Sequence, residues 1–94
     1  MTIYLVAYDV VDQATDRTAV TAALEENYDD RCHMQSSVWL VETEKRSSEI
    51  KADLAACLGR QDRLFVMRLM TRVSARNLDE KGIDWLKAKK VQVF

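Results

Sequence analysis

The stretch Thr2–Asp12, TIYLVAYDVVD, constrains the fold more than any other part of the sequence. It is rich in β-branched and aromatic residues, which favour a strand with packing neighbours on both faces. We therefore predict a central strand here. Asp9 and Asp12 follow where the apolar run ends, and Asp16 stands just before a helical pattern. A carboxylate at the end of a buried strand needs a partner, so we expect a metal ion, a basic side chain or a helix N-terminus near these aspartates.

The length of 94 residues predicts a single domain, residues 1–94, because a chain of this size has room for one core. There is no proline, and Gly59 and Gly82 are the only glycines, so regular structure is expected almost throughout and no glycine-rich loop exists for a nucleotide cofactor. Cys32 and Cys57 lack C-x-x-C spacing, and no apolar run is long enough for a membrane segment. We therefore expect a cytoplasmic protein.

Two helical patterns follow the first strand. One helix is capped by Thr15 or Asp16 and runs to about Asn27. The other is capped by Ser47 or the serine after it, and it ends before Gly59, which stands where a C′ glycine belongs. Both helices carry an apolar stripe and should cover one face of a sheet.

Extended patterns occupy most of the remaining sequence. Residues 31–43 are long for one strand, and a bend near Ser36 and Ser37 would divide them into the end of one strand and the start of the next. Residues 64–70 predict a strand that is apolar at nearly every position. The tail consists of a segment 71–77 that extends this strand or starts another, a short helix over 79–90 and an apolar end.

With the divided second strand, the order becomes strand, helix, strand, strand, helix, strand. It predicts an α+β, ferredoxin-like (split βαβ) sandwich with two helices on one face of an antiparallel sheet, plus a short C-terminal helix. A parallel doubly wound sheet is the alternative. Because both faces of the sheet look apolar and two helices cover only one, we also predict a homodimer, with Trp39 at its interface.

Charge is divided unevenly along the chain. Residues 1–59 carry 5 Lys/Arg against 11 Asp/Glu, giving −6, whereas residues 60–94 carry 9 against 4, giving +5. Arg68, Arg72 and Arg76 share parity, so on an extended segment they would lie on one face and could follow the phosphate backbone of DNA or RNA. The alternative is that these side chains only solvate the outer faces of late elements.

Two short motifs resemble a known protein family. Tyr8-Asp9-Val10 resembles the Y-D-[IV] signature of the small CRISPR-associated proteins of the second core type, and QSSVW at 35–39 resembles their Q-x-S-V-[FWY] strand. VapD-type ribonucleases are similar at both places. The end of this strand, SVWLV at 37–41, resembles the end of the second strand in stand-alone bacterial relatives of this fold.

This resemblance extends over about residues 1–70 and implies a ferredoxin-like fold and a homodimer formed across the sheets. In the members that are nucleases, it implies metal-assisted phosphodiester cleavage by the aspartate at the end of the first strand, which is Asp9 in this sequence. In other members the dimer is a nucleic-acid-binding scaffold.

Asp9 is the candidate metal ligand and catalytic residue. Mg²⁺ often takes one or two carboxylates together with water and phosphate, so one Asp9 from each of two subunits would hold the ion at a two-fold axis. The alternative is that Asp9 caps a turn or pairs with an arginine such as Arg68. Asp12 and Asp16 are expected as turn and cap residues, and His33 is the sole histidine for acid–base chemistry.

Two classes of function stay open at this point. One is a magnesium-dependent endonuclease in which Asp9 binds the metal. The other is a non-catalytic dimeric module that binds nucleic acid or protein, as a scaffold or as a regulatory partner in a defence or toxin–antitoxin setting. No membrane partner is expected.

Overall fold

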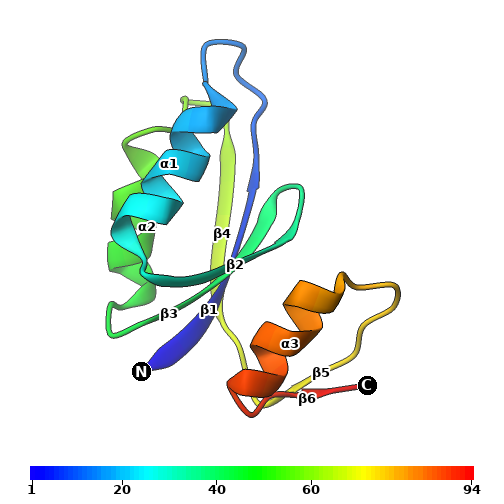
Figure 1. The fold of residues 1–94 in the computed structure, drawn as a ribbon. Helices are drawn as coiled ribbons and strands as arrows, with labels where there is room; N and C mark the ends of the chain where they lie inside the picture. Colours follow the sequence, from blue (N-terminus) through cyan, green and yellow to red (C-terminus); the bar gives the residue numbers. More distant parts are fainter.

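The computed structural model describes residues 1–94 and contains a four-stranded antiparallel sheet and three helices (Figure 1). The elements follow in the order β1 (Thr2–Asp9), α1 (Arg17–Asn27), β2 (Asp30–Gln35), β3 (Val38–Thr43), α2 (Ser47–Ala55), β4 (Arg63–Arg68), β5 (Arg72–Val73), α3 (Glu80–Ala88) and β6 (Gln92–Val93). The sheet has the strand order β2-β3-β1-β4, and β5 and β6 form a separate parallel pair. This is a small α+β protein, compatible with a ferredoxin-like fold.

The first strand is central, as the sequence predicts. β1 pairs antiparallel with β3 on one side and with β4 on the other, which excludes the parallel doubly wound alternative. Its side chains alternate: Val6 and Tyr8 are buried in the main core, whereas Leu5 and Ala7 point to the opposite side of the sheet. We call the side of Val6 the inner face and the side of Leu5 the outer face.

The predicted bend in the second extended segment is confirmed. β2 ends at Gln35, β3 begins at Val38, and Ser36 and Ser37 form the turn between them. The register of the two strands shifts between His33 and Gln35, which marks a bulge at the end of β2.

α1 and α2 cover the inner face, where Figure 1 shows them on one side of the sheet. Asp16 is the N-cap of α1, because its carboxylate accepts the Thr18 N–H at 2.9 Å. α2 begins at Ser47, so its N-cap is Arg46 and neither of the two serines that the sequence predicts. The main core consists of buried side chains from the sheet and both helices: Val6, Tyr8, Val20, Leu24, Tyr28, Trp39, Val41, Ile50 and Leu54.

Gly59 does not end α2 as a C′ glycine, which corrects the sequence prediction. α2 ends at Ala55, and no glycine in the chain has a positive φ. The space around Gly59 explains why a glycine is found there: a Cβ at this position would lie 2.6 Å from Asp12 Oδ2 and 2.7 Å from Asp12 Cβ. The glycine therefore permits a close approach of two loops.

The C-terminal residues 72–94, which we call the C-terminal unit, pack on the outer face. Leu86 of α3 and Val91 are buried together with Leu40 of β3, and half-buried Ile3 and Leu5 of β1 pack against them. Figure 1 shows α3, β5 and β6 together beside the sheet, away from α1 and α2. The expectation that the second face is open is therefore wrong for the part under α3. None of the helices α1, α2 and α3 has the length and the apolar composition that a membrane-spanning segment needs.

Candidate functional site

Part of the outer face stays uncovered. Ala7 pairs with Val38 on one side and with Phe65 on the other, so these three side chains form a row across β3, β1 and β4. Met67 follows Phe65 on the same face of β4, and Phe65 and Met67 are 58% and 45% exposed. We call Ala7, Val38, Phe65 and Met67 the open strip.

Asp9 lies at one end of the open strip, next to Arg63. The two residues are paired across β1 and β4, and Arg63 Nη1 lies 4.0 Å from Asp9 Oδ2. Their side chains are 77% and 67% exposed, so water screens this ion pair strongly. The basic partner expected for Asp9 is therefore present, although it is Arg63 and not Arg68.

Asp9 does not belong to a ready-made metal site within one chain. The structure contains no group of three or more His, Cys, Asp or Glu side chains that could hold a metal ion. Asp12 accepts the Ala14 N–H at 3.0 Å and Asp16 caps α1, so both have the turn and cap roles predicted for them. A Mg²⁺ ion at Asp9 would need further ligands from a second copy of the chain or from a bound phosphate.

Asp62 organises the loops beside Asp9, and the sequence did not predict this role. Its carboxylate accepts hydrogen bonds from the Thr15 hydroxyl and from three backbone N–H groups: Val11 at 2.6 Å, Asp12 at 2.7 Å and Gly59 at 2.6 Å. These hydrogen bonds hold the pKa of Asp62 well below its usual range, and the bond from the Thr15 hydroxyl has the largest effect. The loop after β1 and the loop after α2 are thereby tied together.

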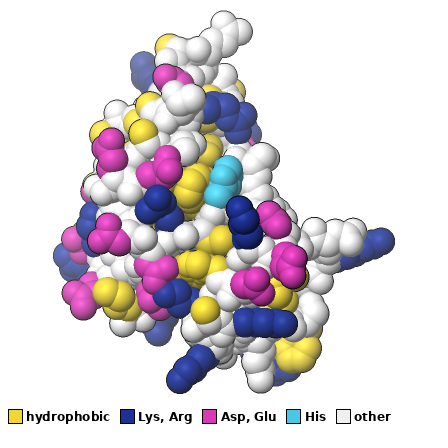
Figure 2. Space-filling view, viewed as in Figure 1, with side chains coloured by type: hydrophobic (Ala, Val, Ile, Leu, Met, Phe, Trp, Pro, Cys, Tyr) yellow, Lys and Arg dark blue, Asp and Glu magenta, His cyan; other side chains and the backbone are white.

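Trp39 is a core residue, which corrects its assignment to a dimer interface. Its side chain is 4% exposed and lies on the inner face under the helices, so it has almost no surface left for a partner. His33 stacks on it, with ring centroids 4.2 Å apart and an interplanar angle of 9°. Figure 2 shows this histidine, in cyan, at the surface beside hydrophobic atoms. Its Nε2 lies 3.3 Å from the Ser36 carbonyl oxygen, and no carboxylate orients it for acid–base chemistry.

The three predicted phosphate-binding arginines lie on three separate segments. Arg68 is the last residue of β4, Arg72 lies in β5, and Arg76 lies in the connection before α3. The chain leaves the main sheet after β4, so the premise that one extended segment carries all three on one face is wrong. All three are exposed and none has a carboxylate partner, although the Arg72 guanidinium lies 5.1 Å from the centroid of the Phe94 ring.

Comparisons with protein-family models and with curated proteins give no match to this chain. Among solved structures, the crystal structure of a hypothetical protein from Thermus thermophilus is similar, with a TM-score of 0.64 and 22% sequence identity. The likeness covers 81% of this chain and 90% of the other. At this level of identity the comparison shows a shared fold.

Proposed function

We propose that this chain is a ferredoxin-like, non-catalytic interaction module that acts as a homodimer, with the open strip as the contact between the two copies. The observation that carries this proposal is the apolar row of exposed Phe65 with half-buried Ala7 and Val38, which lies between the C-terminal unit and the charged pair of Asp9 and Arg63. An apolar patch with a polar rim is typical of a protein–protein contact.

The ferredoxin-like part of the proposal is supported by the strand order β2-β3-β1-β4 together with α1 and α2 on the inner face. Two βαβ units, β1-α1-β2 and β3-α2-β4, joined by the β2–β3 hairpin, produce this order. The C-terminal unit is then an addition to that arrangement.

A second copy of the chain fits the open strip for two reasons. Only 13 of the 94 residues are buried, so burial of further apolar surface between two copies would add stability to a small core. A two-fold interface is self-complementary, and the rim offers one acidic and one basic side chain. Asp9 of one copy would meet Arg63 of the other, and the reverse contact would form at the same time.

Light scattering at tens of micromolar tests the dimer. The wild-type chain should have twice its monomer mass of 10.8 kDa, and Phe65→Glu should be a monomer because a charge would be buried in the contact. Val11→Glu is the matched control, since Val11 is also exposed but lies in the loop after β1. A wild-type mass of 10.8 kDa at every concentration would contradict the proposal.

A magnesium-dependent endonuclease is the second candidate, and the exposure of Asp9 at the end of the open strip favours it. A two-fold axis near this rim would bring two Asp9 carboxylates together, and both could then bind one ion. Cleavage of RNA and DNA with and without Mg²⁺, by the wild type and by Asp9→Asn, tests this candidate. An absence of metal-dependent cleavage in the wild type would remove the nuclease and leave the dimer proposal standing.

A further inference from the structure

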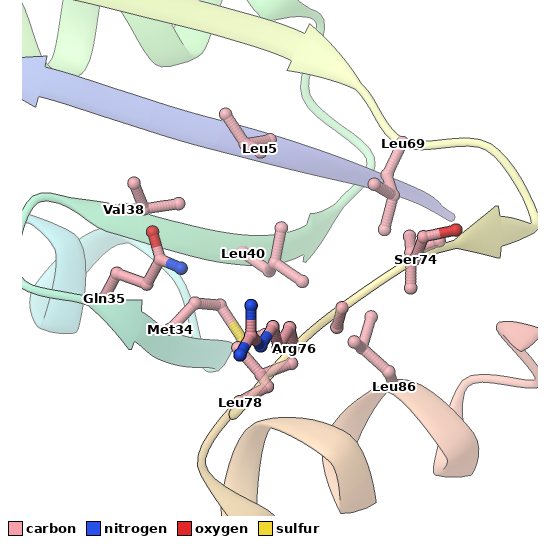
Figure 3. Close-up of a pocket in the computed structure, with 12 residues that line it drawn as sticks. Leu5, Met34, Gln35, Val38, Leu40, Leu69, Ser74, Arg76, Leu78 and Leu86 are labelled. Atoms are coloured by element: carbon pink, nitrogen blue, oxygen red, sulfur yellow. The ribbon is translucent and has the colours of Figure 1, made fainter. Parts of the chain in front are cut away.

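A hollow of about 330 Å³ lies between the outer face of the sheet and the segment that leads into α3 (Figure 3). Its size is at the lower end of the range found for small-molecule sites, about 300–1,000 Å³. The walls are mostly apolar: Leu5 and Leu40 come from the sheet, and Leu69, Leu78 and Leu86 come from the chain that follows it. Such walls suit an apolar molecule.

Three lining residues are not hydrophobic: Gln35, Ser74 and Arg76. Arg76 supplies the only charge in the lining, and no carboxylate in the chain pairs with it. Figure 3 shows its guanidinium group pointing from the connection before α3 toward the sheet. The apolar walls therefore meet one unpaired positive charge.

We infer that the hollow binds an apolar molecule that carries one carboxylate, such as a medium-chain fatty acid. The apolar chain would lie against the leucine walls, where it loses contact with water. The carboxylate would lie on Arg76, because the planar guanidinium donates two parallel hydrogen bonds to a carboxylate. The amide of Gln35, which also lines the hollow, offers a further donor.

The single positive charge in the lining also excludes other classes of ligand. No Asp or Glu lines the hollow, so an apolar amine finds no partner. A single guanidinium and the absence of lysine make it a poor site for a doubly charged phosphate, which usually recruits several cations. One carboxylate therefore matches the one positive charge.

Amide chemical shifts of the full chain, titrated with sodium decanoate below its micelle concentration, test this inference. Saturable shifts should gather at Leu5, Leu40 and Ser74, while decanol and decylamine should bind more weakly than decanoate. Arg76→Gln should weaken decanoate binding about tenfold or more, because a charge-assisted hydrogen bond is lost. Arg72→Gln is the matched control and should bind normally, since Arg72 does not line the hollow.

Ser74→Trp is a second test, because a large side chain at this exposed lining position should fill the hollow and abolish binding while the thermal melt stays unchanged. Three results would overturn the inference: no saturable shifts in the wild type, equal affinity for decanol and decanoate, or equal losses in Arg76→Gln and Arg72→Gln. The last result would show a general attraction of anions to the basic segment.

Discussion

Lys89 at the end of α3 forms an ion pair with Asp30 at the start of β2, and this contact joins the C-terminal unit to the edge of the sheet. Asp30 also accepts a hydrogen bond from Trp85 Nε1 at 3.0 Å, and Lys89 Nζ lies 3.1 Å from Glu42 Oε1. Hydrogen bonding to Asp30 raises the pKa of Lys89, and hydrogen bonding to Lys89 lowers the pKa of Asp30. The two ions thus stabilise each other.

Removal of this contact should loosen the C-terminal unit. Asp30→Ala is expected to lower the free energy of unfolding by about 1 kcal/mol, a small value because the Asp30 side chain is 41% exposed and water screens the pair. Urea denaturation followed by tryptophan fluorescence measures the stability, and the same comparison in a Trp39→Phe background reports on Trp85 alone. Asp29→Ala is the control, since the neighbouring carboxylate is exposed and makes no ion pair. Equal effects of both variants would contradict the anchoring role.

Stability should fall in acid. The folded-state pKa values of Asp62, Asp30 and Asp53 lie below the ordinary value of 3.8, so these carboxylates bind protons less readily in the folded chain than in the unfolded chain. Their contribution is therefore complete above about pH 4 and is lost as the pH falls through the lowered values. Thermal melts from neutral pH down to pH 2 should show this loss.

Asp62 should account for much of the acid sensitivity. Asp62→Asn should melt at a lower temperature at neutral pH and should lose less stability in acid than the wild type, because the charge that binds four donors is gone. Asp84→Asn is the control, since this exposed carboxylate has no hydrogen-bond partner. An Asp62→Asn variant with the acid profile of the wild type would contradict this assignment.

Replacement by alanine should destabilise the protein at Gly59 but not at Gly82. Gly59→Ala places a Cβ within 2.8 Å of three Asp12 atoms and should cost about 1–3 kcal/mol of stability, the usual penalty for overpacking. Gly82→Ala lies inside α3 and meets the flexible end of Met34 at 3.0 Å. Alanine has a greater helix propensity than glycine, which should offset the cost of that contact. The free energy of unfolding of Gly82→Ala should therefore stay near the wild-type value. Chemical denaturation of both variants checks the contrast.

Nucleic-acid binding, if it uses the basic segment, should depend on salt and not on sequence. Replacement of Arg68, Arg72 and Arg76 by alanine should then abolish binding with the fold intact, because these exposed side chains have no carboxylate partners to lose. The control is the double variant Lys51→Ala and Arg60→Ala, which removes positive charge from α2 and from the loop after it. This control should bind nucleic acid normally. Unchanged affinity of the triple variant in a filter-binding assay would exclude this surface.

Local patterns in the sequence predict much of the fold. The alternation along β1, the N-cap Asp16 and the bend at Ser36 and Ser37 each depend on residues close together in the chain, and the structure contains all three. The third helix also occupies the expected residues. What local patterns do not give is the face of the sheet to which each helix docks.

The residue roles that the sequence did not predict are set by contacts between distant parts of the chain. Lys89 reaches Asp30 across 59 positions, and Asp62 reaches Val11 across 51. Trp39 and Val38 are both apolar, and the sequence does not show that the helices cover the face of Trp39 and leave Val38 in the open strip. The position of Asp9 at a strand end was predictable, whereas its arginine partner depended on the register of β1 and β4.

β4 forms one edge of the main sheet, so its position bears on aggregation through strand pairing between molecules. An edge strand presents free backbone groups to which a strand from another molecule can add. Arg63 and Arg68 stand at its two ends, so two such edges placed side by side would bring like charges together. This repulsion disfavours the pairing of two β4 edges, whereas a contact through the outer face of the sheet does not bring these edges together.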